Sequence, residues 1–381
     1  MRHLQVNLQP HFGGGEVFTA FLCQALSAHG IPTDLYVNPK ADFWSRLGLP
    51  KNVNTISAAD FSALAEILPP GPGWLLSHGP LPQALVNTAK QQGWLVTAIA
   101  HMPVQGRNPR AYEGHDLIYP VSGWVLQGLK EAGLPAWSEP LYGVAHLQRR
   151  SDGKAIRQAS VYDWDRRKFR DRLLGILEPL WESVSSHPEY QRRKGLTLGI
   201  VSRLTPIKQF PLMFQHLVPV LAEYPDVSLE IFGSGGYASV RDLRQVLKPL
   251  GSQVRYWGQQ QDVASIYGQI DYLLTGLPEK EALGLNVIEA QACGTPVLAP
   301  RAAPFTETIV DAQSGFLFED PRLDQGADFS RLLARLRLLE ARPNPLAATS
   351  HLQRFSFPAM QERVGRIVTD AACRLQQRQP Q

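Results

Sequence analysis

The chain has 381 residues, a net charge of +4 at pH 7 and an apolar content of 44%. This length suits two domains, and the apolar content is ordinary for a globular protein. Its three cysteines, Cys23, Cys293 and Cys373, follow no metal-ligand spacing. They indicate a reducing, cytoplasmic compartment and no structural zinc. The N-terminus is too polar for a signal peptide and no apolar run reaches membrane-spanning length, so we expect no integral membrane protein.

Basic residues are concentrated between Gln148 and Gly195, where twelve Lys/Arg stand against seven Asp/Glu. A solvated linker helix is the simplest account of this excess. Contact with an anionic membrane surface or an acidic acceptor stays open as an alternative. No aromatic residues alternate with the basic ones and no nucleic-acid motif accompanies them, so we expect no nucleic-acid binding.

The first part of the chain alternates apolar strands with amphipathic helices. Strands are predicted over residues 3–8, 34–37, 74–77, 95–100 and 117–121, and helices over residues 16–29, 58–68, 83–92 and 122–132. This βα alternation predicts a doubly wound parallel sheet, which binds ligands at the carboxyl ends of its strands.

Two features lie at such strand ends. Gly13, Gly14 and Gly15 stand between the first strand and the first helix, where backbone amides can converge on an anion. The dinucleotide fingerprint G-x-G-x-x-G is absent, which argues against a dehydrogenase. His101 directly follows an apolar strand and is a candidate acid, base or hydroxyl-binding group, with a purely structural histidine as the alternative.

A second α/β alternation begins at Leu196. Strands are predicted over residues 196–202, 227–232, 253–257, 271–275, 296–300 and 315–318, and helices over residues 211–224, 240–250, 263–270 and from 285 to Gly294. Helical composition returns after Pro321, a last helix ends near Leu375, and we expect residues 376–381 to be disordered.

The helix that starts near Leu285 has a glutamate and a glycine in the loop before it, Glu281 and Gly284, and Glu289 about one turn in. A helix N-terminus has free backbone N–H groups and a partial positive charge, so it can accept a diphosphate without a metal. Glu289 can accept hydrogen bonds from two vicinal hydroxyls of a ribose. This pattern suits a nucleotide diphosphate sugar, although acidic residues are also common at solvated helix starts.

Taken together, these residues resemble family 4 of the glycosyltransferases. The resemblance rests, in chain order, on Arg203 with Lys208, a Phe-Gly-Ser-Gly-Gly run that ends at Gly236, Trp257-Gly258, Glu281 with Glu289, and Gly294-Thr-Pro-Val297. It is dense over residues 196–318 and thinner before them. It implies an α/β fold of the GT-B type, in which two Rossmann-like doubly wound parallel-sheet domains face a central cleft.

The resemblance also implies roles for individual residues. Arg203 and Lys208 would contact the donor diphosphate, Glu281 the hydroxyls of the donor sugar, and His101 would lie near the reacting centre. The full expected donor-binding set is Gly13, Gly14, Gly233, Gly258, Ala282, Leu283, Gly284, Leu285, Asn286 and Glu289. Members of the family retain the anomeric configuration and usually need no metal, so we expect no metal site and no cofactor besides the donor.

Three further acidic residues, Asp163, Asp165 and Glu279, bear on metal binding or on the choice of donor. Asp163-Trp-Asp165 resembles the D-x-D metal site of another glycosyltransferase class, but no apolar strand ends there. Asp165 fits better as the N-cap of a helix. Glu279 adds a third carboxylate two residues before Glu281, and Leu283 replaces an aromatic residue usual in the family, so both bear on which donor sugar fits.

We therefore divide the chain into an N-terminal Rossmann-like acceptor domain (1–147), a basic interdomain linker or helix (148–195), a C-terminal Rossmann-like nucleotide-sugar-binding domain (196–355), and a C-terminal helix (356–381) that packs back on the N-terminal domain. The expected activity is retaining transfer of a sugar from a uridine or guanosine diphosphate sugar to a sugar, lipid-linked or small-molecule hydroxyl, in glycan or glycolipid synthesis. The alternatives are a nucleotide-sugar epimerase of the same fold and a non-catalytic nucleotide-sugar-binding protein. The expected location is cytoplasmic, with peripheral contact to the inner face of a membrane left open.

Overall fold

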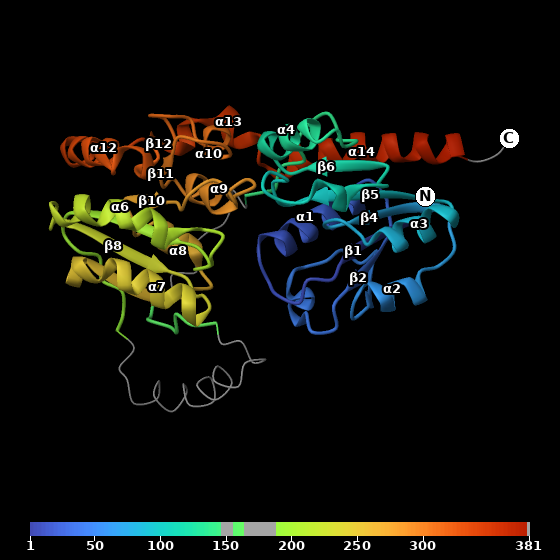
Figure 1. The fold of residues 1–381 in the computed structure, drawn as a ribbon, viewed down its shortest axis with the longest axis horizontal. Coiled ribbons are helices and arrows are strands. Elements are labelled where there is room, and N and C mark those ends of the chain that lie inside the picture. The colour runs from blue at the N-terminus through green and yellow to red at the C-terminus, as the bar shows by residue number, and fades with distance from the viewer. Residues whose placement is uncertain (146–154, 164–187, 379–381) are drawn as a thin grey trace, which may run out of the picture. The chain divides into compact units, whose positions relative to one another are not determined.

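The computed structural model describes residues 1–145, 155–163 and 188–378 (Figure 1). The chain forms two compact units, of which unit 1 comprises Met1–Ala145 with Gln353–Gln381 and unit 2 comprises His146–Leu352. Most of the basic segment 148–195, including Asp165, lies outside the described residues.

Unit 1 is built on a six-stranded sheet in which every strand is parallel to its neighbours, in the order β3-β2-β1-β4-β5-β6. Its strands are β1 (His3–Asn7), β2 (Thr33–Val37), β3 (Val53–Ser57), β4 (Gly73–Ser77), β5 (Trp94–Ala100) and β6 (Leu117–Pro120). The sequence analysis missed β3. This strand lies at the edge of the sheet and is largely exposed, so it lacks the apolar run of a buried parallel strand.

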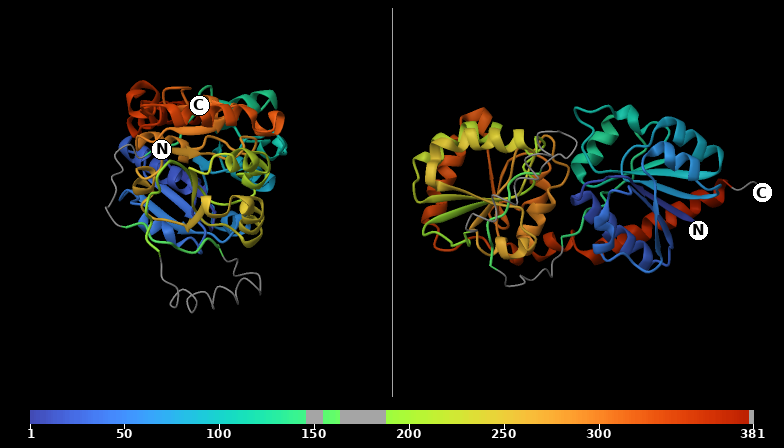
Figure 2. Two further views of the ribbon diagram at one scale, coloured as in Figure 1. Left: turned by 90° about the vertical axis from the view of Figure 1, so that its left-hand side faces the viewer. Right: turned by 90° about the horizontal axis from the view of Figure 1, so that it is seen from below.

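The helices of unit 1 lie on both faces of this sheet (Figures 1 and 2). They are α1 (Gly14–Ala28), α2 (Phe61–Ile67), α3 (Gln83–Gln91), α4 (Gly123–Glu131) and α14 (Phe357–Arg378), with short 3₁₀ turns η1 (Asp42–Arg46) and η2 (Pro109–Tyr112). Side-chain caps fix some of the starts: the Asp60 carboxylate accepts from the Ser62 and Ala63 amides before α2, each at 2.9 Å.

Helix α14 packs on α1, β4 and β5 within unit 1. It continues three residues past Leu375, so the prediction of disorder from residue 376 is wrong up to Arg378. Arg378 holds this last turn: its guanidinium lies 2.7 Å from the Asp116 carboxylate and donates to the Trp94 carbonyl oxygen at 3.1 Å. A cation at a helix C-terminus is also favoured by the helix dipole.

Unit 2 repeats the plan with a second parallel sheet, in the order β12-β11-β10-β7-β8-β9. Its strands are β7 (Leu196–Val201), β8 (Val227–Phe232), β9 (Val254–Gly258), β10 (Tyr272–Leu274), β11 (Val297–Pro300) and β12 (Gly315–Phe318). All six were predicted: five are mostly buried and largely apolar, and the edge strand β9 carries the β-favouring residues Val254, Tyr256 and Trp257.

The helices of unit 2 lie on both faces of its sheet (Figure 2), and two clusters of buried apolar side chains pack within the unit. They are α6 (Phe210–Ala222), α7 (Tyr237–Leu247), α8 (Val263–Tyr267), α9 (Leu285–Ala292), α10 (Phe305–Thr308), α11 (Pro321–Asp324), α12 (Ala327–Leu338) and α13 (Thr349–Gln353), with 3₁₀ turns η3 (Lys248–Gln253) and η4 (Pro345–Ala347). Large side chains such as Phe214 and Phe329 belong to one cluster, and Trp257 and Phe305 belong to the other.

One ion pair is buried in this sheet, between β8 and β9. The Glu230 side chain is fully buried, and Arg255 donates to it through Nε at 2.9 Å and through Nη2 at 2.6 Å. The Trp257 indole N–H donates to the second carboxylate oxygen at 2.7 Å. A buried charge is tolerated when it is paired and hydrogen-bonded in this way, so Glu230 ties the edge strand β9 to β8.

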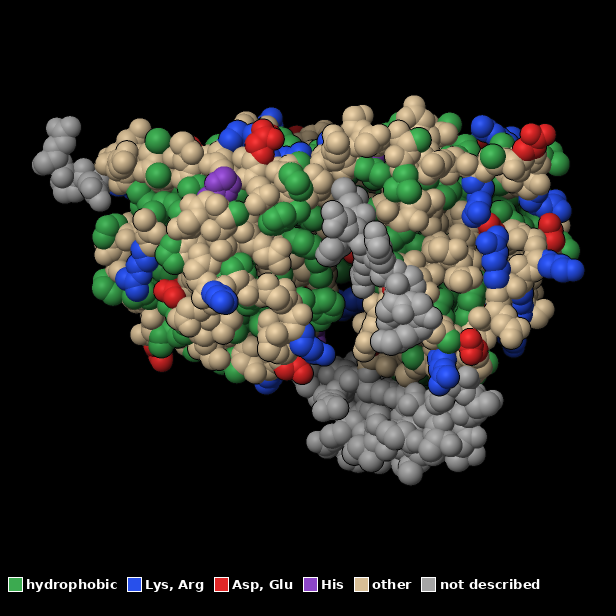
Figure 3. Space-filling model, turned by 180° about the vertical axis from the view of Figure 1, so that it is seen from behind, with side chains coloured by type: hydrophobic (Ala, Val, Ile, Leu, Met, Phe, Trp, Pro, Cys, Tyr) green, Lys and Arg blue, Asp and Glu red, His purple; other side chains and the backbone are tan. Residues whose placement is uncertain are grey.

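The surface carries mixed charge. On the face that Figure 3 presents, Lys and Arg side chains are mixed with Asp and Glu. The residues behind the local basic excess lie mostly in the part of the chain that is not described. Among the described helices, none combines the length and the apolar character needed to cross a bilayer.

Candidate functional site

The strand order of unit 2 reverses between β7 and β10. From β7 the chain proceeds outward through β8 and β9, and it then returns to place β10 on the other side of β7. Ligands of doubly wound sheets bind at this switch point, beyond the carboxyl ends of the two strands. The loop after β7 contains Arg203 and Lys208, and the loop after β10 contains Glu281 and leads into α9. The fold therefore brings these predicted residues to one place.

Gly276 lets the two loops pack directly against each other. The Leu277 amide donates to the Lys208 carbonyl oxygen at 3.2 Å. A Cβ atom at Gly276 would overlap that same carbonyl oxygen, so only glycine fits without a shift of one loop. The sequence analysis did not single out Gly276, because the contact joins residues far apart in the chain.

We expect Gly276→Ala to destabilise the folded chain by about 1–3 kcal/mol, the usual range for an overpacked site. The matched control is Gly236→Ala, since a Cβ atom there would meet nothing within 4 Å. Chemical denaturation of the two variants measures the difference. Equal unfolding midpoints would show that the two loops are not held together at Gly276.

Lys208 and Glu281 form a partly buried ion pair between Nζ and Oε2. The other carboxylate oxygen of Glu281 accepts from the amides of Ala282 and Gly284, each at 3.2 Å. Burial alone would raise the pKa of Glu281, but the charge and hydrogen bond of Lys208 and the two amides outweigh it and lower that pKa. Glu281 is therefore a carboxylate at neutral pH. It orients Lys208 and the loop that leads into α9.

Arg203 differs from Lys208 in being exposed. Within the described ranges its side chain has no hydrogen-bond or ion-pair partner. An exposed guanidinium in the same loop as Lys208 supplies a cation that an anionic ligand can engage without displacing a protein group.

The start of α9 leaves backbone donors open. Gly284 is its N-cap in the left-handed region, with φ 81°, and it provides no side-chain hydrogen bond. The amides of Leu285 and Asn286 have no protein acceptor among residues 1–145, 155–163 and 188–378. The Asn286 side chain donates to the Val201 carbonyl oxygen at 3.1 Å, which fixes the helix start to the end of β7. Free amides at a helix N-terminus attract anions.

Glu289 lies one turn into α9, where the Tyr267 hydroxyl donates to it at 3.4 Å. Tyr267 also donates to the Asn286 carbonyl oxygen at 3.3 Å. Of the rest of the α9 loop, Ala282, Leu283 and Gly284 are buried, so any contact with a ligand there would come from backbone groups near the helix start.

Gly233 and Gly258 are both buried, and packing explains why they are glycine. A Cβ atom at Gly233 would overlap the Ser202 carbonyl oxygen, and one at Gly258 would overlap the carbonyl oxygens of Ala159 and Ser160. Their amide and carbonyl join through a hydrogen bond of 2.8 Å from Gly233 to Gly258. Gly233 thus lets the loop after β8 lie against the loop after β7, and Gly258 lets the end of β9 lie against Ala159 and Ser160.

The other acidic residues are engaged elsewhere. Asp163 accepts from the Ser234 hydroxyl at 2.6 Å, and Glu279 pairs with Arg322 beside Asp320. Across the described residues, no group of three or more His, Cys, Asp or Glu side chains is arranged to hold a metal ion. Glu279 therefore points to a structural partner rather than joining Glu281.

In unit 1 the strand order reverses between β1 and β4. The glycine run follows β1, with Gly13 as the N-cap of α1 and Gly14 as its first residue, and no side chain caps these amides. His101 follows β5, and His78 follows β4. His78 Nδ1 lies 2.8 Å from His101 Nε2, and the two rings stack. The sequence analysis missed His78, although it follows a predicted apolar strand as directly as His101 does.

Both rings are kept neutral by burial. Burial lowers the pKa of His101 to about 4. Burial, with smaller contributions from the neighbouring His101 and His3, lowers the pKa of His78 well below its usual value. At neutral pH each ring therefore carries one proton, and His101 can exchange hydrogen bonds with a ligand but is a weak base.

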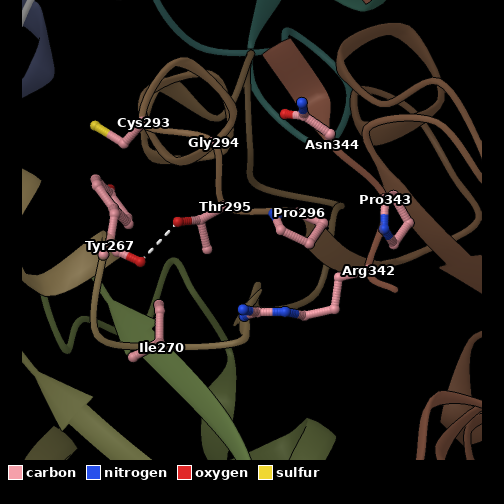
Figure 4. A pocket seen from close by; sticks show the side chains of 10 residues that line it. Tyr267, Ile270, Cys293, Gly294, Thr295, Pro296, Arg342, Pro343 and Asn344 are labelled. Atoms are coloured by element: carbon pink, nitrogen blue, oxygen red, sulfur yellow. Dashed lines mark hydrogen bonds between the residues drawn. The ribbon is translucent and has the colours of Figure 1, made fainter. Parts of the chain in front are cut away.

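A hollow of ≈ 380 Å³ lies elsewhere in unit 2, where α9 ends and β11 begins (Figure 4). The Thr295 hydroxyl donates to the Tyr267 carbonyl oxygen at 2.7 Å at its rim, and Arg342 pairs with Asp271 at 2.6 Å. It is lined by Tyr267, Gly268, Ile270, Cys293, Gly294, Thr295, Pro296, Arg342, Pro343 and Asn344. None of the predicted site residues lines it.

Residues 195–335 match the family described as "Glycosyl transferases group 1". Over 188 residues the chain is 29% identical to the D-inositol 3-phosphate glycosyltransferase of Corynebacterium kroppenstedtii, a match that covers 46% of this chain and 40% of that protein. Over 143 residues it is 32% identical to the GDP-mannose-dependent monoacylated alpha-(1-6)-phosphatidylinositol monomannoside mannosyltransferase of Corynebacterium glutamicum, covering 35% and 36%. The chain thus matches less than half the length of these curated relatives.

Solved structures with the same fold cover nearly the whole chain. The Anabaena HepE structure in complex with UDP and glucose superimposes with a TM-score of 0.67 and 15% identity, over 97% of this chain and 100% of that one. The sucrose-phosphate synthase of Thermosynechococcus elongatus gives a TM-score of 0.69 and 16% identity, over 98% and 99%. These likenesses confirm the predicted fold class, with two Rossmann-like units each built on a parallel sheet.

Proposed function

We propose that the chain, whose residues 195–335 match the group 1 glycosyltransferases, moves a sugar from a nucleotide diphosphate sugar to a hydroxyl acceptor with retention of anomeric configuration. One observation carries the proposal. Arg203 and Lys208 lie in the loop after β7, and the open amides at the start of α9 follow the loop after β10, so all three belong to the switch point of unit 2. A doubly wound sheet binds its ligand there, and these three groups suit an anionic diphosphate.

The chemistry needs what these groups offer. When the bond from the anomeric carbon to the diphosphate breaks, negative charge grows on the leaving diphosphate. The acceptor hydroxyl forms the new glycosidic bond and loses its proton. The leaving group is stabilised most in the transition state, by Lys208, which Glu281 holds in place, by Arg203 and by a helix N-terminus. Glu281 supports Lys208 and, with Gly284, sets the position of α9 relative to the diphosphate.

The names of the relatives and of one structural neighbour support a chemical class for the donor and for the acceptor. One relative is named as GDP-mannose-dependent, and one structural neighbour was solved with UDP and glucose, which supports a guanosine or uridine diphosphate sugar. The names of two relatives contain an inositol phosphate or a phosphatidylinositol mannoside, which supports a polyol or lipid-linked hydroxyl as acceptor. A cytoplasmic location, with peripheral contact to the inner membrane face, fits such an acceptor.

The transfer is proposed to need no divalent metal. Arg203, Lys208 and the start of α9 together neutralise the diphosphate, so a metal would compete with them for the same oxygens. Donor turnover after exhaustive chelation with EDTA should equal turnover with added magnesium or manganese. Activity that disappears on chelation and returns with metal would contradict this, and it would reopen Asp163 and Glu279 as ligands.

A thermal-shift panel of uridine and guanosine diphosphate sugars tests donor binding directly. A ligand that binds only the folded chain raises the unfolding temperature by linkage. Lys280→Ala serves as the control, since Lys280 is an exposed cation next to Glu281. Stabilisation that survives in Lys280→Ala and is lost in Lys208→Ala supports the site. A panel in which no nucleotide sugar stabilises the chain would overturn it.

Measuring donor turnover with and without an acceptor distinguishes the proposed transferase from an epimerase and from a non-catalytic binding protein. An epimerase would alter the donor without any acceptor, and a non-catalytic binding protein would stabilise with the donor and leave it unchanged. Consumption of the donor that depends on an added hydroxyl acceptor excludes both.

A further inference from the structure

A group of polar side chains lies at the carboxyl end of the unit 1 sheet, around His78 and His101. Gln5 on β1 and Cys23 and Thr19 on α1 are fully buried beside them. Cys23 Sγ lies 3.5 Å from Gln5 Oε1, and Gln5 Nε2 lies 2.6 Å from His78 Nε2. His78 Nδ1 in turn lies 2.8 Å from His101 Nε2. These contacts form one continuous chain from the core to His101.

The hydrogen bonds that link Cys23 to His101 all run in one donor-to-acceptor direction, which begins at the Cys23 thiol. Burial raises the pKa of Cys23 to about 12, so the sulfur keeps its proton at neutral pH and donates it to the Gln5 carbonyl oxygen. The amide nitrogen of Gln5 then faces His78 and donates to His78 Nε2, because an amide nitrogen cannot accept. His78 Nε2 is consequently the unprotonated nitrogen of that ring.

The next link follows from the single proton of each neutral ring. His78 must carry its proton on Nδ1 and donate it to His101 Nε2. The Thr19 hydroxyl agrees with this direction, since it donates to the Gly15 carbonyl oxygen at 2.8 Å and presents its own oxygen to His78 Nδ1 at 3.1 Å. The same oxygen lies 3.4 Å from His78 Nε2, and neither atom has a proton to share there in this arrangement, so this longer contact is not a hydrogen bond.

His101 therefore accepts through Nε2 and carries its proton on Nδ1. In the part of the chain that the structure describes, Nδ1 has no hydrogen-bond partner, and the ring is only partly buried. Phe18 packs edge-on against the ring at a centroid distance of 4.9 Å and fixes its plane. The ring is thus presented with its single donor outward.

We propose that Cys23, Gln5 and His78 act as a positioning chain that locks His101 in its Nδ1–H tautomer, so that His101 donates a hydrogen bond to an oxygen of the bound sugar or acceptor and does not remove its proton. This rests on the proposed transfer activity only for the identity of the oxygen. The tautomer itself follows from unit 1 alone. His78 is a positioning residue, since it reaches a ligand only through His101.

Nitrogen-15 NMR of the histidine rings in the full-length chain tests the tautomer without any assay. His115 supplies an internal reference for the Nδ1–H form: its Nε2 accepts from the Leu81 amide at 3.3 Å and its Nδ1 donates to the Tyr112 carbonyl oxygen at 3.0 Å. We expect the ring nitrogens of His78 and His101 to show the same pattern as His115 at neutral pH. A proton on Nε2 of His101 would overturn the proposal.

Two variants of His78 test the link to His101. Asparagine can place an amide donor where Nδ1 stood, whereas leucine fills similar space and donates nothing. We expect His101 to stay in the Nδ1–H form in His78→Asn and to lose it in His78→Leu. The rate of transfer should fall by about 10-fold or more in His78→Leu, the lower end of the range for residues that act through a residue in contact with the ligand. Most of this loss should be recovered in His78→Asn. The control is His29→Leu, which replaces an exposed histidine at the end of α1.

The two readouts separate failure of this proposal from failure of the proposed function. If no donor is turned over but NMR finds His78 and His101 in the Nδ1–H form, the positioning chain is supported and the proposed transfer activity is contradicted. If transfer is normal in His78→Leu, or equally low in His78→Asn and His78→Leu with both folded, the positioning role is wrong. Adding His101→Ala to His78→Leu should cause little further loss, because residues that act as one unit are not additive.

Discussion

Lys208→Ala should lower kcat/KM for sugar transfer by about 10²–10³-fold, the scale expected when one preorganised charged contact to a developing charge is removed. Lys208 lies at the switch point of unit 2 and is held in place by Glu281. Arg203→Ala should show a loss of the same scale, because Arg203 follows the same strand and is exposed to a ligand. Steady-state kinetics with the donor varied measures both effects.

Lys280→Ala is the matched control for these variants, since it removes an exposed lysine one residue from Glu281. It should keep near-normal transfer. Near-normal transfer in Lys208→Ala or Arg203→Ala would place that residue away from the diphosphate.

Lys208→Ala should also change how the stability of the fold depends on pH. Lys208 lowers the pKa of Glu281, so the pair stabilises the fold above the unfolded pKa near 4.5 and loses this contribution as pH falls through the folded value. Without Lys208, only the amides of Ala282 and Gly284 would oppose the effect of burial, which raises the pKa of Glu281. Lys208→Ala should therefore lose stability at neutral pH, where the wild type keeps the pair.

Arg255→Ala should destabilise the folded chain by about 3–5 kcal/mol, the effect of removing one partner from a buried ion pair. The Glu230 carboxylate would lose its cation and keep the hydrogen bond from the Trp257 indole. Arg241→Ala removes an arginine from an exposed pair with Asp242 and should shift stability by less than about 1 kcal/mol. Chemical denaturation of both variants gives the comparison.

A second substitution distinguishes the buried charge from lost packing. Glu230→Gln in the Arg255→Ala background removes the uncompensated charge and should recover part of the stability. No recovery would mean that Arg255 acts by covering Tyr190 and Trp257, over whose rings its guanidinium lies at 5.2 and 5.0 Å. Equal stability of Arg255→Ala and Arg241→Ala would contradict the ion-pair account altogether.

The parallel sheets were predictable because buried parallel strands are near-continuous apolar runs. β5 is buried along its whole length and was predicted to within one residue. β3 pairs with β2 alone and exposes three of its five residues, so nothing in its composition separates it from a loop. The last turn of α14 was missed for a related reason, since Arg378 is ordered by Asp116, a partner far away in the sequence.

In the candidate site too, local sequence features were predictable and contacts between distant residues were not. Arg203 and Lys208 were singled out through the resemblance to family 4, and Glu281 and Glu289 through their places before and within a helix that the sequence reveals. The ion pair between Lys208 and Glu281 and the contact at Gly276 depend on β7 and β10 being neighbours, and sequence alone does not give that order. The direction of the chain that ends at His101 depends on individual donors and acceptors, which periodicity does not encode.

The central claim is that a nucleotide diphosphate sugar loses its sugar at the switch point of unit 2. The most direct measurement follows the anomeric proton signals of uridine and guanosine diphosphate sugars by NMR, with a hydroxyl acceptor, for the wild type and for the double variant Arg203→Ala/Lys208→Ala. The account predicts that the wild type consumes a donor only when the acceptor is present and forms a product with the donor's anomeric configuration, while the double variant does neither. Donor that stays intact with the wild type, product of inverted configuration, or equal turnover by the double variant would contradict it.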